Sequence, residues 1–263
     1  MLASMDGLAK NALLIVALLA VVIAGSYFYS RSIGPDRTAT PMPATETPAR
    51  PEILVGTPVH AQLKVGLDLR DQGRLDQAVA ALEQVPADDA GYLVALESIG
   101  SIRMRLGDWD GARRAFEELC TIQVTTRDLL ANIAWVNFRL EDYDGAELAA
   151  LRALEIEPDD DELRYDVGLF RVARGELAEA IGTYERAILR NSDRETILHG
   201  LTGLSTLHEL HPDIPGTHYA LAYFARRLSR DEMEVEELRH YLASNPAGPT
   251  ADFARSRLDA LGG

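Results

Sequence analysis

Histidines in the C-terminal third of the chain are the residues whose types and spacing come closest to a metal site. His208 and His211 are three residues apart, which places them on one face of a helix, and Asp213 and His218 follow. Imidazole nitrogens and carboxylate oxygens are zinc ligands, so a weak metal site is one interpretation. The other is that these histidines lie at a helix end, near unpaired carbonyl groups. We favour the second interpretation and predict neither a metal nor any other cofactor.

No catalytic motif accompanies the histidines. The sequence has no glycine-rich phosphate loop, no Gly-x-Ser-x-Gly turn, no Cys-x-x-Cys pair and no His-Glu-x-x-His motif. Cys120 is the single cysteine. Its position near the predicted end of a helix suits a small buried apolar side chain better than a nucleophile. We therefore predict no catalytic residue and a protein that is not an enzyme.

The elements that must position these side chains follow a repeat of 34 residues. Four alanines recur at this spacing: Ala78, Ala112, Ala146 and Ala180. A period of 34 residues is typical of helix-turn-helix solenoids.

Other positions of the period define two helices in each repeat. Twelve residues before the alanine there is a small residue, which would let two helices approach closely. Five residues before it, glycine is usual and suits the left-handed backbone that ends a helix. Apolar residues follow the alanine at helical spacing. The three sets are Gly66, Gly100, Ala134 and Gly168; Gly73, Gly107, Glu141 and Gly175; and Leu82, Phe116, Ala150 and Tyr184.

These residues resemble the tetratricopeptide repeat family, most clearly in the runs at 107–112 and 141–146 and in Ile156-Glu157-Pro158. The resemblance implies an all-α, right-handed solenoid of stacked helix pairs. It also implies binding of a protein or peptide in a concave groove lined by the first helices. The sequence departs from the family where a tyrosine is usual, at Leu69, Arg103, Asn137 and Arg171.

The period sets the domain boundaries. We predict four repeats over 58–192, an extra helix and proline-rich loop over 193–214, a degenerate fifth repeat over 215–248 and a capping helix over 249–263. Ser192 and Glu195 form a capping-box pattern at the start of the extra helix.

The N-terminal region is predicted to anchor the chain in a membrane. After a short tail at 1–11, residues 12–30 contain no charge and would cross most of a roughly 30 Å hydrocarbon core as a helix. A cleaved signal peptide is the alternative. The proline-rich residues 31–57 should form an extended linker. Basic residues flanking the anchor weakly favour a cytoplasmic repeat domain by count, but the arrangement is typical of bacterial envelope proteins, and we expect a single-pass protein with a periplasmic repeat domain.

Charge narrows the choice of partners. The chain has a net charge of −15. Acidic and basic residues cancel within 1–58, so the excess lies in the repeats. An acidic solenoid repels phosphate backbones and anionic lipid, so we expect no nucleic acid, and membrane contact only through the N-terminal helix.

The expected function is that of a membrane-anchored scaffold that binds a partner protein, with homo-oligomerisation as a further option. Alternatives are a periplasmic holdase or assembly chaperone, or a non-catalytic subunit of an envelope complex. The side chains predicted to line the groove are Leu63, Leu67, Arg70, Ser101, Met104, Arg105, Trp135, Phe138, Arg139, Tyr165 and Leu169.

Overall fold

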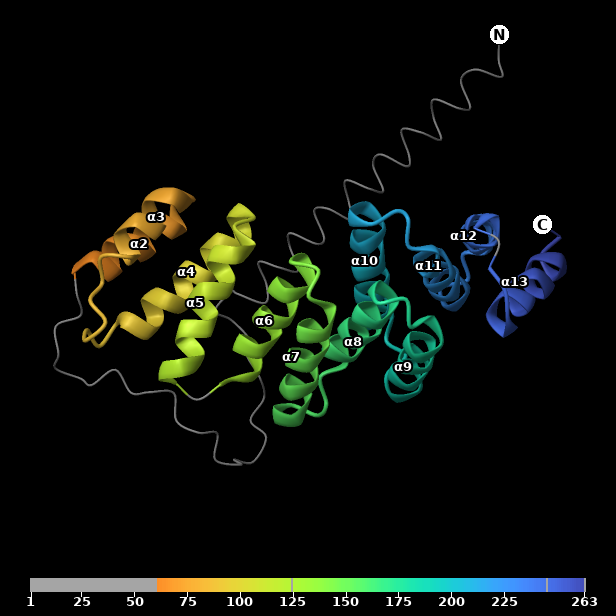
Figure 1. The fold of residues 1–263 in the computed structure, drawn as a ribbon, viewed down its shortest axis with the longest axis horizontal. Helices are drawn as coiled ribbons and strands as arrows, with labels where there is room; N and C mark the ends of the chain where they lie inside the picture. Colours follow the sequence, from red (N-terminus) through yellow and green to blue (C-terminus); the bar gives the residue numbers. More distant parts are fainter. Residues whose placement is uncertain (1–60, 124, 245, 263) are drawn as a thin grey trace, which may run out of the picture. The chain divides into compact units, whose positions relative to one another are not determined.

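The computed structural model describes residues 61–123, 125–244 and 246–262, and these form α-helices without a strand (Figure 1). The predicted tail, membrane anchor and linker lie outside these residues. Among the residues described, no helix has the length and apolar character needed to cross a membrane. The helices are α2 (Ala61–Asp71), α3 (Leu75–Leu82), α4 (Tyr92–Leu106), α5 (Trp109–Ile122), α6 (Arg127–Arg139), α7 (Tyr143–Ile156), α8 (Asp161–Ala173), α9 (Leu177–Arg190), α10 (Arg194–Leu210), α11 (Pro215–Arg227), α12 (Asp231–Ala243) and α13 (Pro249–Ala260).

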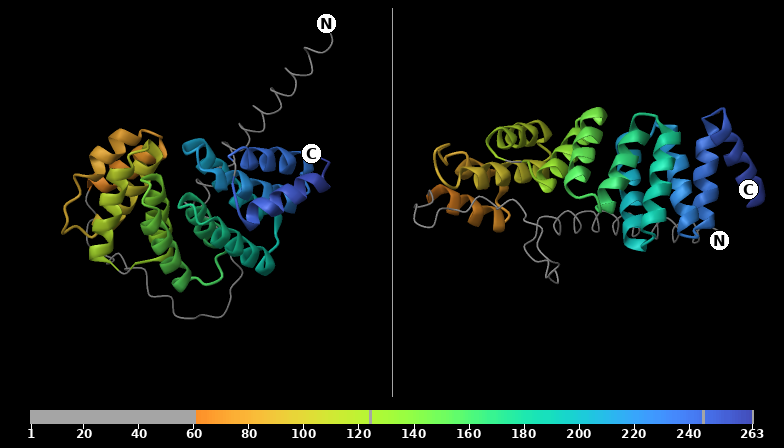
Figure 2. Two further views of the ribbon diagram at one scale, coloured as in Figure 1. Left: turned by 45° about the vertical axis from the view of Figure 1, so that its right-hand side comes forward. Right: turned by 90° about the horizontal axis from the view of Figure 1, so that it is seen from below.

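The helices pack in pairs that follow the sequence period, which confirms the all-α repeat fold. α2 packs on α3, α4 on α5, α6 on α7 and α8 on α9, and the second helix of each of the first three pairs contacts the next pair (Figures 1 and 2). The alanines of the 34-residue period are fully buried between these helices. One hydrophobic cluster joins the helices from α6 to α11, and a second joins α2 to α5.

Each turn between paired helices uses one left-handed residue, at the predicted position. Gly73, Gly107 and Gly175 have φ of 75°, 76° and 83°. In the third repeat this position is Glu141, with φ of 61°. The conformation is easy for glycine and strained for a residue with a Cβ atom.

Helix capping explains the Asp-x-x-Gly pattern in two of the repeats. The Asp108 carboxylate accepts a hydrogen bond from the Gly111 amide at 2.9 Å, and Asp142 accepts one from Gly145 at 3.0 Å. A Cβ atom on either glycine would collide with the capping carboxylate. The sequence run therefore fixes the start of helices α5 and α7.

The small residue of the first helix fits against one large residue of the second. A Cβ atom at Gly66 would lie 2.5 Å from the Leu82 side chain, and one at Gly100 would overlap the Phe116 ring. Gly168 faces Tyr184 in the same way. In the third repeat the two positions hold Ala134 and Ala150, both buried, so a larger residue on one helix coincides with a smaller residue on the other.

Helix α10 interrupts this order. It packs on α8 and α11 rather than pairing with α9. Gly200 faces Tyr165 and Gly203 faces Leu169, so α10 runs parallel to α8. Its N-cap is Asp193, whose carboxylate accepts a hydrogen bond from the Glu195 amide at 2.9 Å, and not Ser192 as the sequence suggested.

The last pair, α11 and α12, is closed by α13. Glu234 of α12 lies 54 residues after Ala180, which is the offset of the degenerate repeat, and is buried where the other repeats have alanine. The Arg257 guanidinium of α13 contacts both Glu234 oxygens, at 2.7 and 2.9 Å. The capping helix thus neutralises the one charge that the repeat buries at this position.

Candidate protein-binding face

The structure separates the predicted groove residues into buried and accessible sets. The buried set has almost no surface with which to touch a partner, and consists of Leu63, Met104, Phe138, Tyr165 and Leu169. The set with partial or full exposure consists of Leu67, Arg70, Ser101, Arg105, Trp135 and Arg139.

Helix α10 is the reason that the fourth repeat offers no open first-helix surface at Tyr165 and Leu169. A Cβ atom at Gly200 would lie 2.7 Å from the Tyr165 ring, and one at Gly203 would lie 3.0 Å from Leu169. Burial also raises the pKa of Tyr165 to about 12, so its phenol stays neutral. The sequence could have signalled this contact, because glycines inside a helix often mark a close approach of another element.

The accessible residues that remain lie on α4 and α6 in matching positions. Ser101 and Arg105 are four residues apart on α4, and Trp135 and Arg139 are four apart on α6, so each pair shares one helix face. The two pairs are one period apart. We call these four residues the α4–α6 patch.

Aromatic packing holds the α6 half of this patch in place. The Trp135 ring lies 5.1 Å from the Phe138 ring, which in turn packs 5.5 Å from Phe170 in the core. The Arg139 guanidinium lies over the Trp109 ring, 4.3 Å from its centre. Burial lowers the pKa of Arg139, but a guanidinium remains charged at neutral pH. Sequence reasoning missed Trp109 as part of this site, because it belongs to a second helix.

The arginines at the family's tyrosine position form ion pairs inside the repeats. Arg171 binds the buried carboxylate of Glu147 at 2.7 Å, and Arg174 binds the same carboxylate at 2.8 Å. Arg103 pairs with Glu83 and also donates to the Gly111 carbonyl oxygen at 3.2 Å. Because their charges are already matched, these arginines offer less to a partner than Arg105 and Arg139 do.

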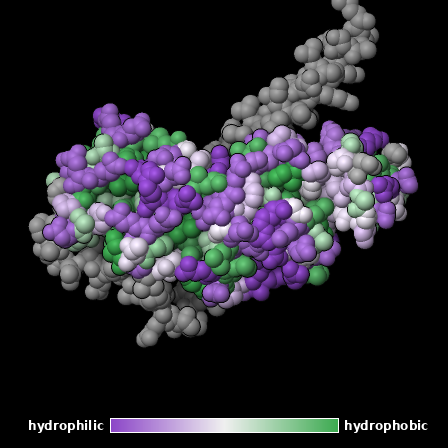
Figure 3. Space-filling view, viewed as in Figure 1, coloured by the Kyte–Doolittle hydropathy of each residue, from purple (hydrophilic) through white to green (hydrophobic). Residues whose placement is uncertain are grey.

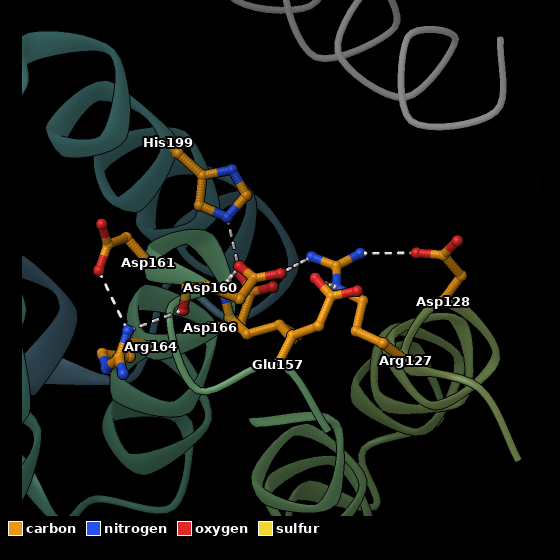
Figure 4. Close-up of polar contacts among 9 residues, drawn as sticks. Arg127, Asp128, Glu157, Asp160, Asp161, Arg164, Asp166 and His199 are labelled. Atoms are coloured by element: carbon orange, nitrogen blue, oxygen red, sulfur yellow. Dashed lines mark hydrogen bonds and ion pairs between the residues drawn. The ribbon is translucent and has the colours of Figure 1, made fainter. Parts of the chain in front are cut away.

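A polar network joins the N-terminal ends of α6, α8 and α10 (Figure 4). Arg127 pairs with Asp160, which also caps α8 by accepting a hydrogen bond from Leu163 at 2.9 Å. His199 of α10 lies 2.9 Å from the Asp166 carboxylate of α8. Burial alone would lower the pKa of His199, but the Asp166 charge and hydrogen bond outweigh it and leave this pKa above its ordinary value.

Those pairings give the network a structural role. Arg127, Arg164 and His199 each have a carboxylate partner, and they connect three successive first-helix positions (Figure 4). The sequence did not identify it, because its members are 33 residues apart and are brought together only by stacking.

The candidate reactive residues do not form a catalytic site. Cys120 is half-buried, and burial raises the pKa of its thiol, which keeps it protonated. His211 packs edge-on against Tyr143 and lies 3.8 Å from Glu141, away from His208. His208 instead meets His218, with 4.8 Å between ring centres.

Comparison with known proteins agrees with the repeat fold. A family model described as tetratricopeptide repeat matches residues 63–123 and 131–195. The crystal structure of MamA is 18% identical over 69% of this chain and 94% of its own, with a TM-score of 0.47. YrrB, described as a TPR protein with an unusual peptide-binding site, is 19% identical over 74% of this chain and 90% of its own, with a TM-score of 0.43.

A tetratricopeptide repeat protein from Parabacteroides merdae is 15% identical over 76% of this chain and 84% of its own, with a TM-score of 0.49. No curated protein sequence matches the chain. The repeat period, the paired helices and the family match together support the assignment of residues 63–123 and 131–195 to the tetratricopeptide repeat family.

Proposed function

We propose that this chain is a membrane-anchored scaffold that binds a partner protein through the α4–α6 patch. The observation that carries the proposal is the accessible combination of Trp135 and Arg139 beside Arg105 and Ser101. Tryptophan and arginine are the side chains that most often dominate the energy of protein interfaces. Since most other arginines on the first helices are paired internally, this patch is where a partner's carboxylate would find a cation.

The patch also limits the chemistry of the partner. Trp135 offers an aromatic surface, and Arg105 and Arg139 offer guanidinium groups on the same side, in a domain of net negative charge. An extended segment or helix with an apolar residue next to aspartate or glutamate fits this arrangement. The surface around it mixes hydrophilic and hydrophobic residues (Figure 3).

The test is co-purification of partners by tagged variants from crosslinked cells. Trp135→Ala should remove the dominant partner or reduce its recovery at least tenfold, because a truncated hot spot costs about 2 kcal/mol or more. Leu189→Ala is the matched control, since Leu189 is an apolar residue of α9 with 86% exposure outside the patch. Unchanged recovery with a folded Trp135→Ala variant would contradict the proposal.

Attachment to a membrane is a separate part of the proposal. It rests on the uncharged residues 12–30 and the proline-rich linker that follows. We propose that the repeats lie on the outer side of a bacterial inner membrane. The full chain should remain in the membrane fraction after a high-salt wash, whereas the chain lacking residues 1–30 should be released. Release of the full chain by salt would contradict anchoring.

A further inference from the structure

Three histidines and a glutamate meet where the last helices of the chain come together. His208 lies in the last turn of α10, His218 near the start of α11, and Glu237 and His240 near the end of α12. The rings of His208 and His218 are 4.8 Å apart, and those of His218 and His240 are 5.0 Å apart. The imidazoles therefore form a continuous row across three helices.

A carboxylate is placed next to this row. Glu237 Oε2 is 2.8 Å from His218 Nδ1. Glu237 and His240 are three residues apart on α12, so they share a helix face. One ligand atom from each of His218, Glu237 and His240 can be chosen so that the three lie within 4.8 Å of one another.

We propose that His218, Glu237 and His240 bind one divalent transition-metal ion of the Zn²⁺ type, with His208 as the fourth ligand. Neutral imidazole is a preferred ligand for zinc and its neighbours in the first transition series, and a carboxylate oxygen completes many such sites. A carboxylate that holds one histidine nitrogen directs the other nitrogen toward the metal, which is the arrangement found around zinc-bound histidines.

His208 provides a second observation that points to a ligand. Its Nδ1 atom is buried and has no hydrogen-bond partner among the residues described. A buried imidazole nitrogen without a partner costs free energy, and coordination would satisfy it. The row of histidines thus ends on a nitrogen that is already withdrawn from solvent.

Metal binding requires only a modest closure of the cluster. Ligand atoms around tetrahedral zinc, with bonds of about 2.0–2.1 Å, are roughly 3.4 Å apart. The ligand atoms of His218, Glu237 and His240 lie within 4.8 Å. His240 is exposed, so its side chain can change rotamer without disturbing the core. The bound ion would tie α10 to the α11–α12 pair.

The experiment is a calorimetric titration of Zn²⁺ into the full chain, purified without a polyhistidine tag and stripped with a chelator. We expect one ion per chain and a rise in melting temperature on loading. His240→Ala, at an exposed position, should reduce affinity at least about tenfold while leaving the fold intact, and Glu237→Gln should reduce it by about 10–100-fold. Co²⁺ in place of Zn²⁺ should give the visible absorption of a tetrahedral site.

His211→Ala is the matched control, because His211 is a half-buried histidine of the same region that contacts Tyr143 and Glu141 instead of the cluster. It should bind zinc as the unaltered chain does. Two results would overturn the proposal: no zinc uptake by the unaltered chain, or uptake that survives when His240→Ala and Glu237→Gln are combined. Both are independent of whether the α4–α6 patch binds a protein.

Discussion

At the scale of single residues, Glu141 departs from the pattern of the other turns. Its backbone has the left-handed conformation that Gly73, Gly107 and Gly175 adopt in the equivalent turns. A residue with a Cβ atom pays about 1–2 kcal/mol for this conformation, whereas glycine pays less. Its contact with His211 is an exposed pair at 3.8 Å, which contributes little.

We therefore expect Glu141→Gly to raise the free energy of unfolding by up to about 1 kcal/mol, after the larger entropy of glycine in the unfolded chain is subtracted. Gly107→Ala is the counterpart, because nothing lies near a Cβ atom at Gly107 and only its φ of 76° opposes the change. It should lower stability by about 1–2 kcal/mol. Urea denaturation measures both, and a destabilised Glu141→Gly variant would show that the turn is held by something else.

The pair formed by His199 and Asp166 predicts a dependence of stability on pH. Since the folded pKa of His199 lies above its ordinary value, the pair stabilises the fold most at pH below the unfolded pKa of about 6.5. That contribution is lost as pH rises through the folded pKa. The neighbouring charges that set it are Asp166 and Glu162 on α8 and Arg127 on α6.

Asp166→Asn should therefore lower the free energy of unfolding more at about pH 5.5 than at about pH 8.5. The measurement is urea denaturation at both values. In a chain that also carries His199→Gln, the cost of Asp166→Asn should be the same at the two values. A cost that rises with pH in the unaltered background would contradict the assignment.

At the scale of helices, each pair is fixed by one small residue packed against one large one. Gly100 on α4 faces Phe116 on α5, and the same positions in the third repeat hold Ala134 and Ala150. Gly100→Ala should therefore cost about 1–3 kcal/mol through overlap with the Phe116 ring. Phe116→Ala alone should cost about 3–5 kcal/mol, because it empties a buried site.

The double variant Gly100→Ala, Phe116→Ala reproduces the alanine pair of the third repeat. Since the added methyl then enters space that the ring has left, its cost should fall short of the sum of the single costs by at least about 1 kcal/mol. Additive costs, measured by chemical denaturation, would show that the two positions do not share one space.

The same helix-level rules show what the sequence could and could not predict. The period placed the four helix pairs and their turns, because small residues, left-handed turns and apolar faces all recur with it. It also indicated a helix over 193–210, and α10 covers 194–210. It did not indicate where α10 packs. That depends on Gly200 and Gly203 meeting side chains of α8, which is a contact outside the repeat pattern.

At the scale of the whole molecule, α10 determines which first-helix surface stays available. By packing on α8 it buries Tyr165 and Leu169, and the side chains of α4 and α6 remain accessible. The predicted groove residues Leu63, Met104 and Phe138 are buried for a different reason, because they point between their own helix and its neighbours. A helical period of 3.6 residues does not separate a partner-facing position from an adjacent core position.

The histidines show the same limit over a longer range. His208 and His218 were visible in the sequence as neighbours, but Glu237 and His240 join them only through the packing of α11 on α12. Sequence proximity favoured His211 and Asp213 instead. Spacing along one helix is therefore a weaker guide to this cluster than the order in which the helices stack.

The central claim is that the α4–α6 patch binds a partner, and site-specific photo-crosslinking tests it most directly. A photoreactive phenylalanine analogue at position 135 replaces one aromatic residue by another, and the same analogue at the exposed position 189 is the control. After irradiation of cells, position 135 should give one dominant adduct that is missing at position 189. No adduct at position 135, or the same adducts from both positions, would contradict the claim.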